Sequence, residues 1–204
     1  MFVGVSARPS QNGAVLNPPS LPFATPLIVP GWRDSGPGHW QTLFAQRLPG
    51  ARRVVQRDWF NPKRAEWVAT LARQVLDAPT PVVIVAHSLG CIATAHLPPE
   101  AARRVRGALL VAPANPERRA QLHDFAPVPC ERLPYRSILV ASHDDPYCRP
   151  RLAGAYARAW GSEFVRLPAA GHINVESGHG DWPLGLALIH SLMADASAPA
   201  ALTH

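Results

Sequence analysis

The sequence predicts an α/β fold in which a six-stranded, mostly parallel sheet carries helices on both faces. From residue 26 onward, short runs of β-branched and aliphatic residues alternate with longer segments of helical periodicity, as in successive βα units. The central runs are apolar at consecutive positions, which is typical of strands buried on both faces. The 204 residues suffice for one well-filled domain. We therefore expect a single domain over residues 26–194, preceded by a flexible arm (1–25) and followed by a tail (195–204).

Six segments are expected to form the strands. Each is short, rich in Val, Ile or Leu, and bounded by residues that favour turns. They are Pro26–Pro30, Arg52–Asp58, Pro81–His87, Arg106–Ala112, Ser137–Ser142 and Glu163–Pro168. We expect the strand order 2-1-3-4-5-6, in which the chain reverses direction between the first and third strands. The loops that follow these two strands then meet at a switch point, where open α/β sheets bind their ligands.

Helical patterns fill the intervals between the strands. The longest, residues 63–78, places apolar side chains on one face at helical spacing. The last has a start signal, with Asp181 as the N-cap and Pro183 in the first turn. This last helix is expected to run from about Trp182 to Met193. One of the other helices is expected to begin at His39, and two more are expected to follow Ser88 and Arg149.

Two segments show no periodicity. Residues 1–25 are rich in Pro, Ser and Asn and are expected to form a loose arm. Arg8 and Pro9 interrupt the only apolar start, so a signal peptide is not expected. Residues 113–136 are rich in proline, and a loop of this length in a compact domain usually serves function or partly covers a site. We expect this segment to form a rim over the site without closing as a lid.

Composition excludes several kinds of partner. The formal net charge is +6, but the basic residues are spread along the chain without a block, so nucleic-acid binding is not expected. The longest apolar run is far shorter than the roughly 20 residues of a membrane span. The three cysteines, Cys91, Cys130 and Cys148, are odd in number and show no C-x-x-C spacing. We expect a soluble, cytoplasmic protein with no cofactor, no metal, and no nucleic-acid or membrane partner.

The segment "AHSLG" marks a candidate nucleophile at the end of the third strand. Its A-x-S-x-G pattern resembles a nucleophile elbow, in which the serine sits on a turn so tight that the residues two positions away must be small. Ala86 and Gly90 meet this requirement around Ser88, although glycine is the commoner residue at the first of these positions. The alternative is that Ser88 is simply the N-cap of the following helix.

A serine nucleophile needs a base to take its proton and an acid to orient that base. The segment "SHDDPYCRP" follows the fifth strand, and "LPAAGHINVESGHG" follows the sixth, giving the chain order Ser, Asp, His that α/β-hydrolases show. His172 is the preferred base, because its competitor His179 lies further from the strand end. Asp145 is the preferred acid, with Asp144 as a turn-forming or solvent-facing neighbour. The remaining histidines lack metal-ligand spacing.

An oxyanion formed at Ser88 needs backbone donors. We expect one from the N–H of Leu89, directly after the nucleophile, and the other from Trp32 in "PGWRDSG", the loop after the first strand. Gly31 and Trp40 are candidate substrate-binding residues, with Trp32 and Trp40 at the entrance of the site; the alternative for Trp40 is packing in the core. The glycines of this loop match neither the phosphate-binding motif G-x-x-x-x-G-K-[ST] nor the dinucleotide-binding motif G-x-G-x-x-G, so no nucleotide site is expected.

Five motifs together resemble the retinoblastoma-binding protein 9 family of small serine hydrolases, in its bacterial branch. They are "VPGWRDSGPGHWQ", "AHSLGC", "ASHDDPYC", "AAGHIN" and "SGHGDWPLG", and the match runs from about residue 26 to 193. The resemblance implies a minimal α/β-hydrolase core without a separate lid domain. It also implies that Ser88 is the nucleophile, Asp145 the acid and His172 the base.

The expected function is hydrolysis of a small acyl ester through an acyl-enzyme intermediate, with a small-molecule acyl substrate as the partner. An amidase or peptidase would use the same triad, since the two reactions differ in how the leaving group is protonated and bound. A non-catalytic interaction module that keeps the fold is the third alternative, because fold does not dictate function.

Overall fold

The computed structural model describes residues 24–195, so the expected arm up to residue 23 and the expected tail from residue 196 lie outside the described residues. The first strand begins one residue earlier than the sequence predicts. Thr25, expected in the arm, is the first residue of β1 (Thr25–Val29). Its backbone N–H donates to the carbonyl of Pro81 at 2.9 Å, and its side chain is hydrogen-bonded to that of Thr80 at 2.8 Å.

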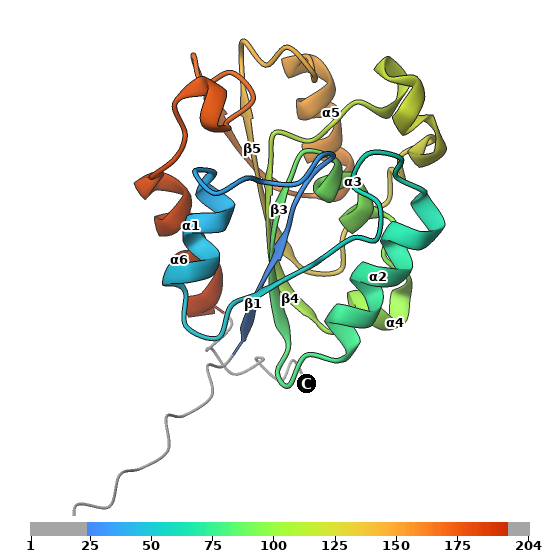
Figure 1. The fold of residues 1–204 in the computed structure, drawn as a ribbon, viewed down its shortest axis with the longest axis vertical. Coiled ribbons are helices and arrows are strands. Elements are labelled where there is room, and N and C mark those ends of the chain that lie inside the picture. The colour runs from blue at the N-terminus through green and yellow to red at the C-terminus, as the bar shows by residue number, and fades with distance from the viewer. Residues whose placement is uncertain (1–23, 196–204) are drawn as a thin grey trace, which may run out of the picture.

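Six parallel strands form one sheet in the order β2-β1-β3-β4-β5-β6, which confirms the predicted topology (Figure 1). After β1 the strands are β2 (Arg52–Arg53), β3 (Val82–His87), β4 (Val105–Val111), β5 (Arg136–Ser142) and β6 (Glu163–Leu167). β2 is shorter than the predicted segment through Asp58. The chain leaves the sheet after Val54 and crosses toward the carboxyl end of β1, where the carbonyl of Trp59 accepts a hydrogen bond from the Arg33 N–H.

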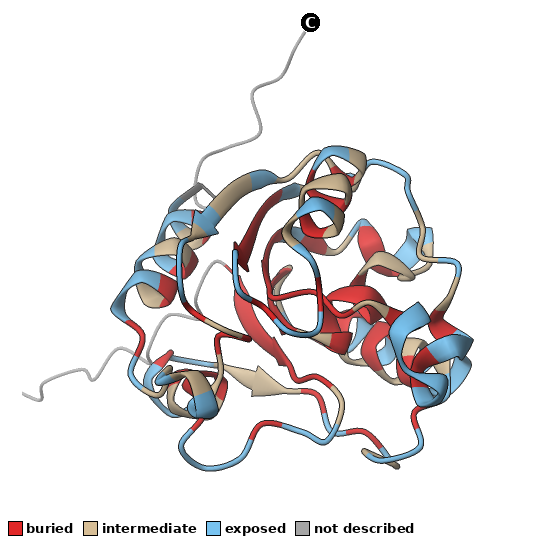
Figure 2. Ribbon diagram, turned by 90° about the horizontal axis from the view of Figure 1, so that it is seen from above, coloured by how far each residue is buried: buried red, intermediate tan, exposed pale blue. Residues whose placement is uncertain are grey.

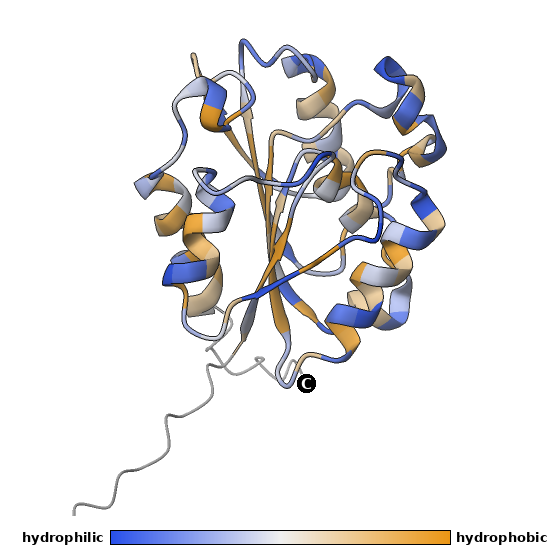
Figure 3. Cartoon of the chain, viewed as in Figure 1, coloured by the Kyte–Doolittle hydropathy of each residue, from blue (hydrophilic) through white to orange (hydrophobic). Residues whose placement is uncertain are grey.

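Strand side chains alternate between two apolar cores, one on each face of the sheet. Leu27 and Val29 face one core, and Ile28 faces the other. Figure 2 shows the central strands buried, and Figure 3 shows that they are also the most apolar part of the chain. Helices α1 (Trp40–Arg47) and α6 (Pro183–Asp195) cover one face. Helices α2 (Arg64–Leu76), α3 (Leu89–Ala95), α4 (Pro99–Ala102) and α5 (Pro150–Trp160) cover the other (Figure 1).

The structure differs from the sequence-based expectation at two helices. The four residues of α4 were not expected, because so short a helix shows no periodicity. α6 begins at Pro183, so Asp181 is not its N-cap; the Asp181 carboxylate pairs instead with Arg47 of α1. Within residues 24–195, no helix combines the length and apolar character needed to cross a membrane.

The segment between β4 and β5 contains two short 3₁₀ helices, η1 (Pro116–Arg118) and η2 (Ala120–Phe125). Leu122 and Phe125 of η2 are buried and join the core on the α2 side of the sheet. Because all the strands are parallel, their carboxyl ends share one edge, and the loops that follow β1, β3, β4, β5 and β6 converge there.

Candidate active site

Ser88 occupies a strained turn between β3 and α3. Its backbone has φ 53° and ψ −118°, and its side chain makes no capping bond to α3, so Ser88 is not a conventional helix cap. The turn is held to β4, because the Ser88 N–H donates to Val111 at 2.9 Å and the Ser88 carbonyl accepts from Ala114 at 3.2 Å. A Cβ added to Gly90 would lie 2.3 Å from the Val29 carbonyl oxygen. Only glycine therefore fits two residues after the serine.

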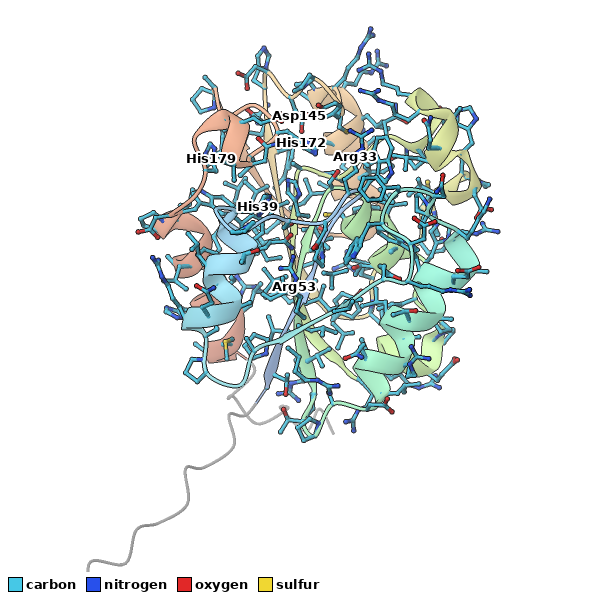
Figure 4. All side chains as sticks on the ribbon, in the orientation of Figure 1. Arg33, His39, Arg53, Asp145, His172 and His179 are labelled. Carbon is cyan, nitrogen blue, oxygen red and sulfur yellow. The ribbon has the colours of Figure 1, made fainter. Side chains whose placement is uncertain are left out.

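Ser88, His172 and Asp145 are joined by side-chain hydrogen bonds. The Oγ of Ser88 lies 3.0 Å from Nε2 of His172, and Nδ1 of His172 lies 2.9 Å from Oδ2 of Asp145. Figure 4 shows Asp145 and His172 side by side at the carboxyl-end edge of the sheet. The Asp145 side chain is 1% exposed, and its Oδ1 also accepts the Tyr147 N–H at 2.8 Å. Because an ionised carboxylate only accepts, the His172 Nδ1 carries the proton and leaves Nε2 free to accept from Ser88.

The two competing residues lie elsewhere. His179 hydrogen-bonds to the Ser177 hydroxyl at 3.3 Å and makes no contact with Ser88 among the described residues. Asp144 is exposed and lies in the turn after β5, as expected, but it also makes hydrogen bonds that the sequence does not reveal. Its Oδ1 accepts hydrogen bonds from the Ser142 hydroxyl and from the N–H groups of Ala170 (3.1 Å) and Gly171 (2.9 Å).

The hydrogen bonds to Asp144 fix the loop that carries the histidine. The bond from Ser142, followed by that from the Gly171 N–H, holds the pKa of Asp144 below its usual range. Gly171 has φ 53°, and a Cβ added there would lie 2.7 Å from the Cβ of Ser177. Asp144 thus ties the end of β5 to the residue directly before His172.

The loop after β1 packs closely against the elbow. A Cβ added to Gly31 would lie 2.8 Å from the Cβ of Ser88 and 3.3 Å from the Leu89 nitrogen. Among the described residues, the backbone N–H groups of Trp32 and Leu89 have no acceptor, and Leu89 is the first residue of α3. Two unpaired donors thus stand on either side of the contact between this loop and the nucleophile.

A cavity of about 430 Å³ opens above Ser88 and His172. It is lined by Trp32, Arg33, Asp34, His39, His87, Ser88, Ala114, Asn115, Arg118, Arg119, Leu122, Pro146, Tyr147, His172, Asn174 and Glu176. A larger hollow of about 870 Å³ lies between α5 and β6, but neither Ser88 nor His172 lines it. The smaller cavity is therefore the one that places a bound molecule beside the nucleophile.

Trp32 lines this cavity, as expected, and its Nε1 donates to the Phe60 carbonyl at 2.9 Å. Trp40 does not line the cavity. Trp40 is completely buried, donates through Nε1 to the Ile173 carbonyl at 2.8 Å, and lies one turn from Phe44 on the face of α1 that packs on the sheet. The expectation that Trp40 lines the entrance is wrong. Gly31 is also buried and supports the elbow without lining the cavity.

The sequence matches the family model described as serine hydrolase over residues 26–191. The chain belongs to this family. No curated protein matches its sequence.

Solved structures agree with this assignment. The serine hydrolase is similar to a YdeN-like hydrolase from Pectobacterium atrosepticum, with 34% identity, coverage of 85% of this chain and 92% of that chain, and a TM-score of 0.78. The ydeN gene product from B. subtilis has 20% identity, coverage of 84% and 99%, and a TM-score of 0.69. A thermophilic esterase from Thermogutta terrifontis has 14% identity, coverage of 85% and 91%, and a TM-score of 0.62. The last two likenesses show a shared α/β-hydrolase fold.

Gln41 is a structural residue of the serine hydrolase site that the sequence analysis missed. Its side chain is completely buried, and its Nε2 donates to the carbonyls of Val29 (3.1 Å) and Val85 (2.9 Å). It thereby bridges β1 and β3 close to the switch point, and its Oε1 accepts from the Ser35 hydroxyl at 2.7 Å. The only signal in the sequence is a polar residue next to Trp40 at the start of α1, which does not reveal burial.

Two further histidines of the serine hydrolase lie behind His172. The His87 ring is 4.8 Å from the His172 ring and 4.9 Å from the His39 ring, measured between centroids. The Nε2 of His87 donates to the His172 carbonyl at 2.9 Å. Burial lowers the pKa of His87 well below its usual value and that of His39 to about 4, with Arg53 contributing to the second shift. Both rings are neutral at neutral pH and form an uncharged packing layer behind the base.

Replacing His39 by asparagine is expected to weaken the pH dependence of stability. The pKa of His39 is lowered from 6.5 in the unfolded chain to about 4 in the folded one, so the unfolded state binds the extra proton as the pH falls through this window. Above pH 6.5 the neutral His39 makes its full contribution to the free energy of unfolding. As the pH falls toward about 4, this contribution is lost, which lowers the free energy of unfolding by about 3 kcal/mol.

Asparagine keeps the capping acceptor that the His39 Nδ1 provides to the Gln41 N–H. The free energy of unfolding of the variant, measured by urea denaturation near pH 7 and near pH 4.5, should therefore fall less on acidification than that of the parent. Equal losses in the two proteins would contradict the assignment. His87 is present in both proteins, and removing the neighbouring His39 lessens the lowering of its pKa, which weakens the pH dependence of the variant in the same direction.

No group of three or more His, Cys, Asp or Glu side chains within residues 24–195 is arranged to hold a metal ion. The buried thiols are also poor nucleophiles, since burial raises the pKa of Cys148 to about 12 and that of Cys91 further. Ser88 is therefore the candidate nucleophile of the described site.

Proposed function

We propose that this serine hydrolase cleaves a small acyl ester through an acyl-enzyme intermediate, with Ser88 as nucleophile, His172 as base and Asp145 as the orienting acid. The observation that supports this assignment is the unbroken hydrogen-bonded chain from the Ser88 Oγ through both ring nitrogens of His172 to Asp145. We also infer that, within the serine hydrolases, the chain is of the bacterial retinoblastoma-binding protein 9 type, on the five motifs given above.

In the acylation step the Ser88 Oγ attacks the ester carbonyl carbon while its proton passes to Nε2 of His172. The negative charge that develops on the carbonyl oxygen is stabilised by the backbone N–H groups of Leu89 and Trp32. The imidazolium is stabilised by Asp145 and then donates its new proton to the departing alcohol oxygen as the carbon–oxygen bond breaks.

The second step releases the acid. Water enters the vacated part of the cavity, gives a proton to Nε2 of His172, and attacks the acyl carbon. The collapse of the second oxyanion returns the proton from His172 to the Ser88 Oγ and frees the carboxylic acid. The triad is thereby restored, and no external oxidant or cofactor is consumed.

Labelling with a fluorophosphonate probe tests the proposal, because such probes react with an activated serine. Mass spectrometry of the labelled protein should place the adduct on Ser88. Hydrolysis of p-nitrophenyl acetate compared with p-nitroacetanilide then separates esterase from amidase activity, since both release a chromophore. Lack of labelling together with lack of hydrolysis would indicate a binding module that keeps the fold.

We expect short acyl chains to be the better substrates. The cavity of about 430 Å³ is bounded on one side by η1 and η2, and the short 3₁₀ helices of residues 113–136 form a rim instead of a cap. Acetyl to hexanoyl esters should therefore have higher kcat/KM than dodecanoyl esters. The measurement is kcat/KM along a series of p-nitrophenyl esters from about two to sixteen carbons. A maximum beyond about ten carbons would reveal an acyl tunnel and overturn the expectation.

A further inference from the structure

Three arginines on the rim of the cavity have no acidic partner. Arg33 lies in the loop after β1, while Arg118 and Arg119 lie at the end of η1, and all three line the cavity above Ser88. Within residues 24–195 none of these three forms an ion pair, in contrast to Arg47, Arg53 and Arg136. An arginine without a carboxylate partner at a ligand cavity keeps its donors available for an anionic group.

Contacts hold these arginines around the triad. The Nη1 of Arg118 donates to the carbonyl of Pro146, the residue after Asp145, at 3.0 Å. The guanidinium carbon of Arg119 lies 5.5 Å from the centroid of the Tyr147 ring, and that ring lies 4.6 Å from the His172 ring in an edge-on arrangement. The rim segment thus presents two guanidinium groups beside the loop that carries the acid, one of them over the Tyr147 ring that contacts the base.

Arg33 approaches from the opposite side of the nucleophile. It has φ 68°, a left-handed conformation that a non-glycine residue adopts only when surrounding contacts enforce it. Its N–H donates to the Trp59 carbonyl at 3.0 Å, and its guanidinium carbon lies 4.5 Å from the Trp32 ring. Figure 4 shows Arg33 on the same side of the molecule as His172 and Asp145. A strained backbone therefore holds this cation next to Trp32, one of the two candidate oxyanion donors.

The acidic groups that line the cavity do not cancel this charge. They are Asp34 and Glu176. Asp34 is paired with Arg53, which does not line the cavity, at 2.6 Å, so its charge is balanced from outside. Among the described residues, three guanidinium groups therefore outnumber the two carboxylates that no arginine balances, Glu176 on the lining and the buried Asp145 behind His172. A concave site with an excess of one sign of charge concentrates ligands of the opposite sign.

We propose that the ester cleaved at this site carries a carboxylate close to the scissile bond, in its acyl or its alcohol part. The inference rests on the proposed function and names its substrate class. Guanidinium groups bind carboxylates through charge-assisted, often bidentate hydrogen bonds, which are stronger than neutral ones. The arginines lie on two sides of Ser88, so one of them can hold the anionic group while the ester carbonyl stays beside the nucleophile.

Two pairs of esters of nearly equal size test the proposal. Monomethyl succinate and methyl succinamate differ by a carboxylate against an amide in the acyl part. Butyryl glycolate and butyryl glycolamide differ in the same way in the alcohol part. In at least one pair, kcat/KM of the parent protein should be about tenfold higher for the anion, the scale of a hydrogen bond to a charged group. Raising the salt concentration should reduce this preference and leave the neutral esters nearly unaffected.

Arginine variants assign the preference to these residues. The double variant Arg118→Gln/Arg119→Gln and the single variant Arg33→Gln should each be compared with Arg73→Gln, whose exposed side chain on α2 does not line the cavity. At least one of the two rim variants should lose about fivefold or more of the preference for the anion, mainly through the KM of the anionic ester; the preference is the ratio of kcat/KM within a pair, so a loss common to both esters cancels. Arg73→Gln should retain the preference.

Equal kcat/KM within both pairs, or a preference that survives in both rim variants, would overturn the inference while leaving the esterase proposal intact. Failure of all four esters and of p-nitrophenyl acetate would instead overturn the proposed function, and the substrate class with it. The two failures are therefore distinguishable.

Discussion

Replacing Ser88 by alanine is expected to lower kcat for p-nitrophenyl acetate by about 10³-fold or more and to abolish fluorophosphonate labelling. The variant lacks the hydroxyl that is hydrogen-bonded to Nε2 of His172, so the acyl-enzyme cannot form. The residual rate would come from the unpaired N–H groups of Trp32 and Leu89 and from binding in the cavity. Steady-state hydrolysis and gel fluorescence of the labelled protein measure the two losses.

A matched variant separates chemistry from general effects of removing a hydroxyl. Ser191→Ala removes an exposed serine on α6 whose hydroxyl donates to the Leu188 carbonyl of the same helix. It should retain labelling and activity. A Ser88→Ala protein that still reacts with the probe, with the adduct on another serine, would rule out the assignment of the nucleophile.

Replacing Asp145 by asparagine is expected to lower kcat by about 10²-fold to 10⁴-fold. The amide would no longer require Nδ1 of His172 to carry the proton, so the ring could present a protonated Nε2 to Ser88 and fail as a base. The change is nearly isosteric, and Asp145 is buried, so the thermal unfolding temperature should be measured alongside kcat to separate this effect from unfolding.

Asp144→Asn should behave differently, because Asp144 acts on the loop and not on the imidazole. The amide oxygen of the variant can still accept a hydrogen bond from the Gly171 N–H, but this bond is weaker because the acceptor is no longer charged. We therefore expect a loss in kcat of about tenfold or less together with a lower unfolding temperature. Asp77→Asn, at the exposed C-cap of α2, is the control and should change neither quantity. If Asp144→Asn cost more in kcat than Asp145→Asn, the orienting acid would be Asp144.

The sequence predicted the fold and the approximate place of the site because both depend on the order of elements along the chain. Ser88, Asp145 and His172 each follow a strand, and in a parallel sheet the strand ends gather at one edge. Their chain order and the small residues around Ser88 therefore carry three-dimensional information. The same reasoning located the cavity rim between β4 and β5 but not its 3₁₀ helices, which are too short to leave a periodic pattern.

The errors concern side-chain direction and partners that are distant in sequence. Trp40 bonds to a carbonyl 133 positions away, and Asp144 bonds to the Gly171 N–H 27 positions away. Neither separation leaves a local signal, so Trp40 was expected at the entrance, and the hydrogen bonds of Asp144 were missed although its exposed position in a turn was expected. The rim arginines were hidden in the same way, because the sequence shows basic residues dispersed along the chain and only the fold brings Arg33 near Arg118 and Arg119.

The segment between β4 and β5 supplies Asn115, Arg118, Arg119 and Leu122 to the cavity, yet none of the reacting groups. Only Ala114, at its start, is bonded to the elbow, through its N–H to the Ser88 carbonyl. Residues 115–135 can therefore be exchanged between homologues as a cassette, with Ala114, the strand ends and apolar residues at the core positions of Leu122 and Phe125 retained. Relatives with this scaffold can therefore differ in the substrates that they bind while keeping the same catalytic residues. A graft of this segment alone should change the substrate selectivity and leave Ser88, Asp145 and His172 in place.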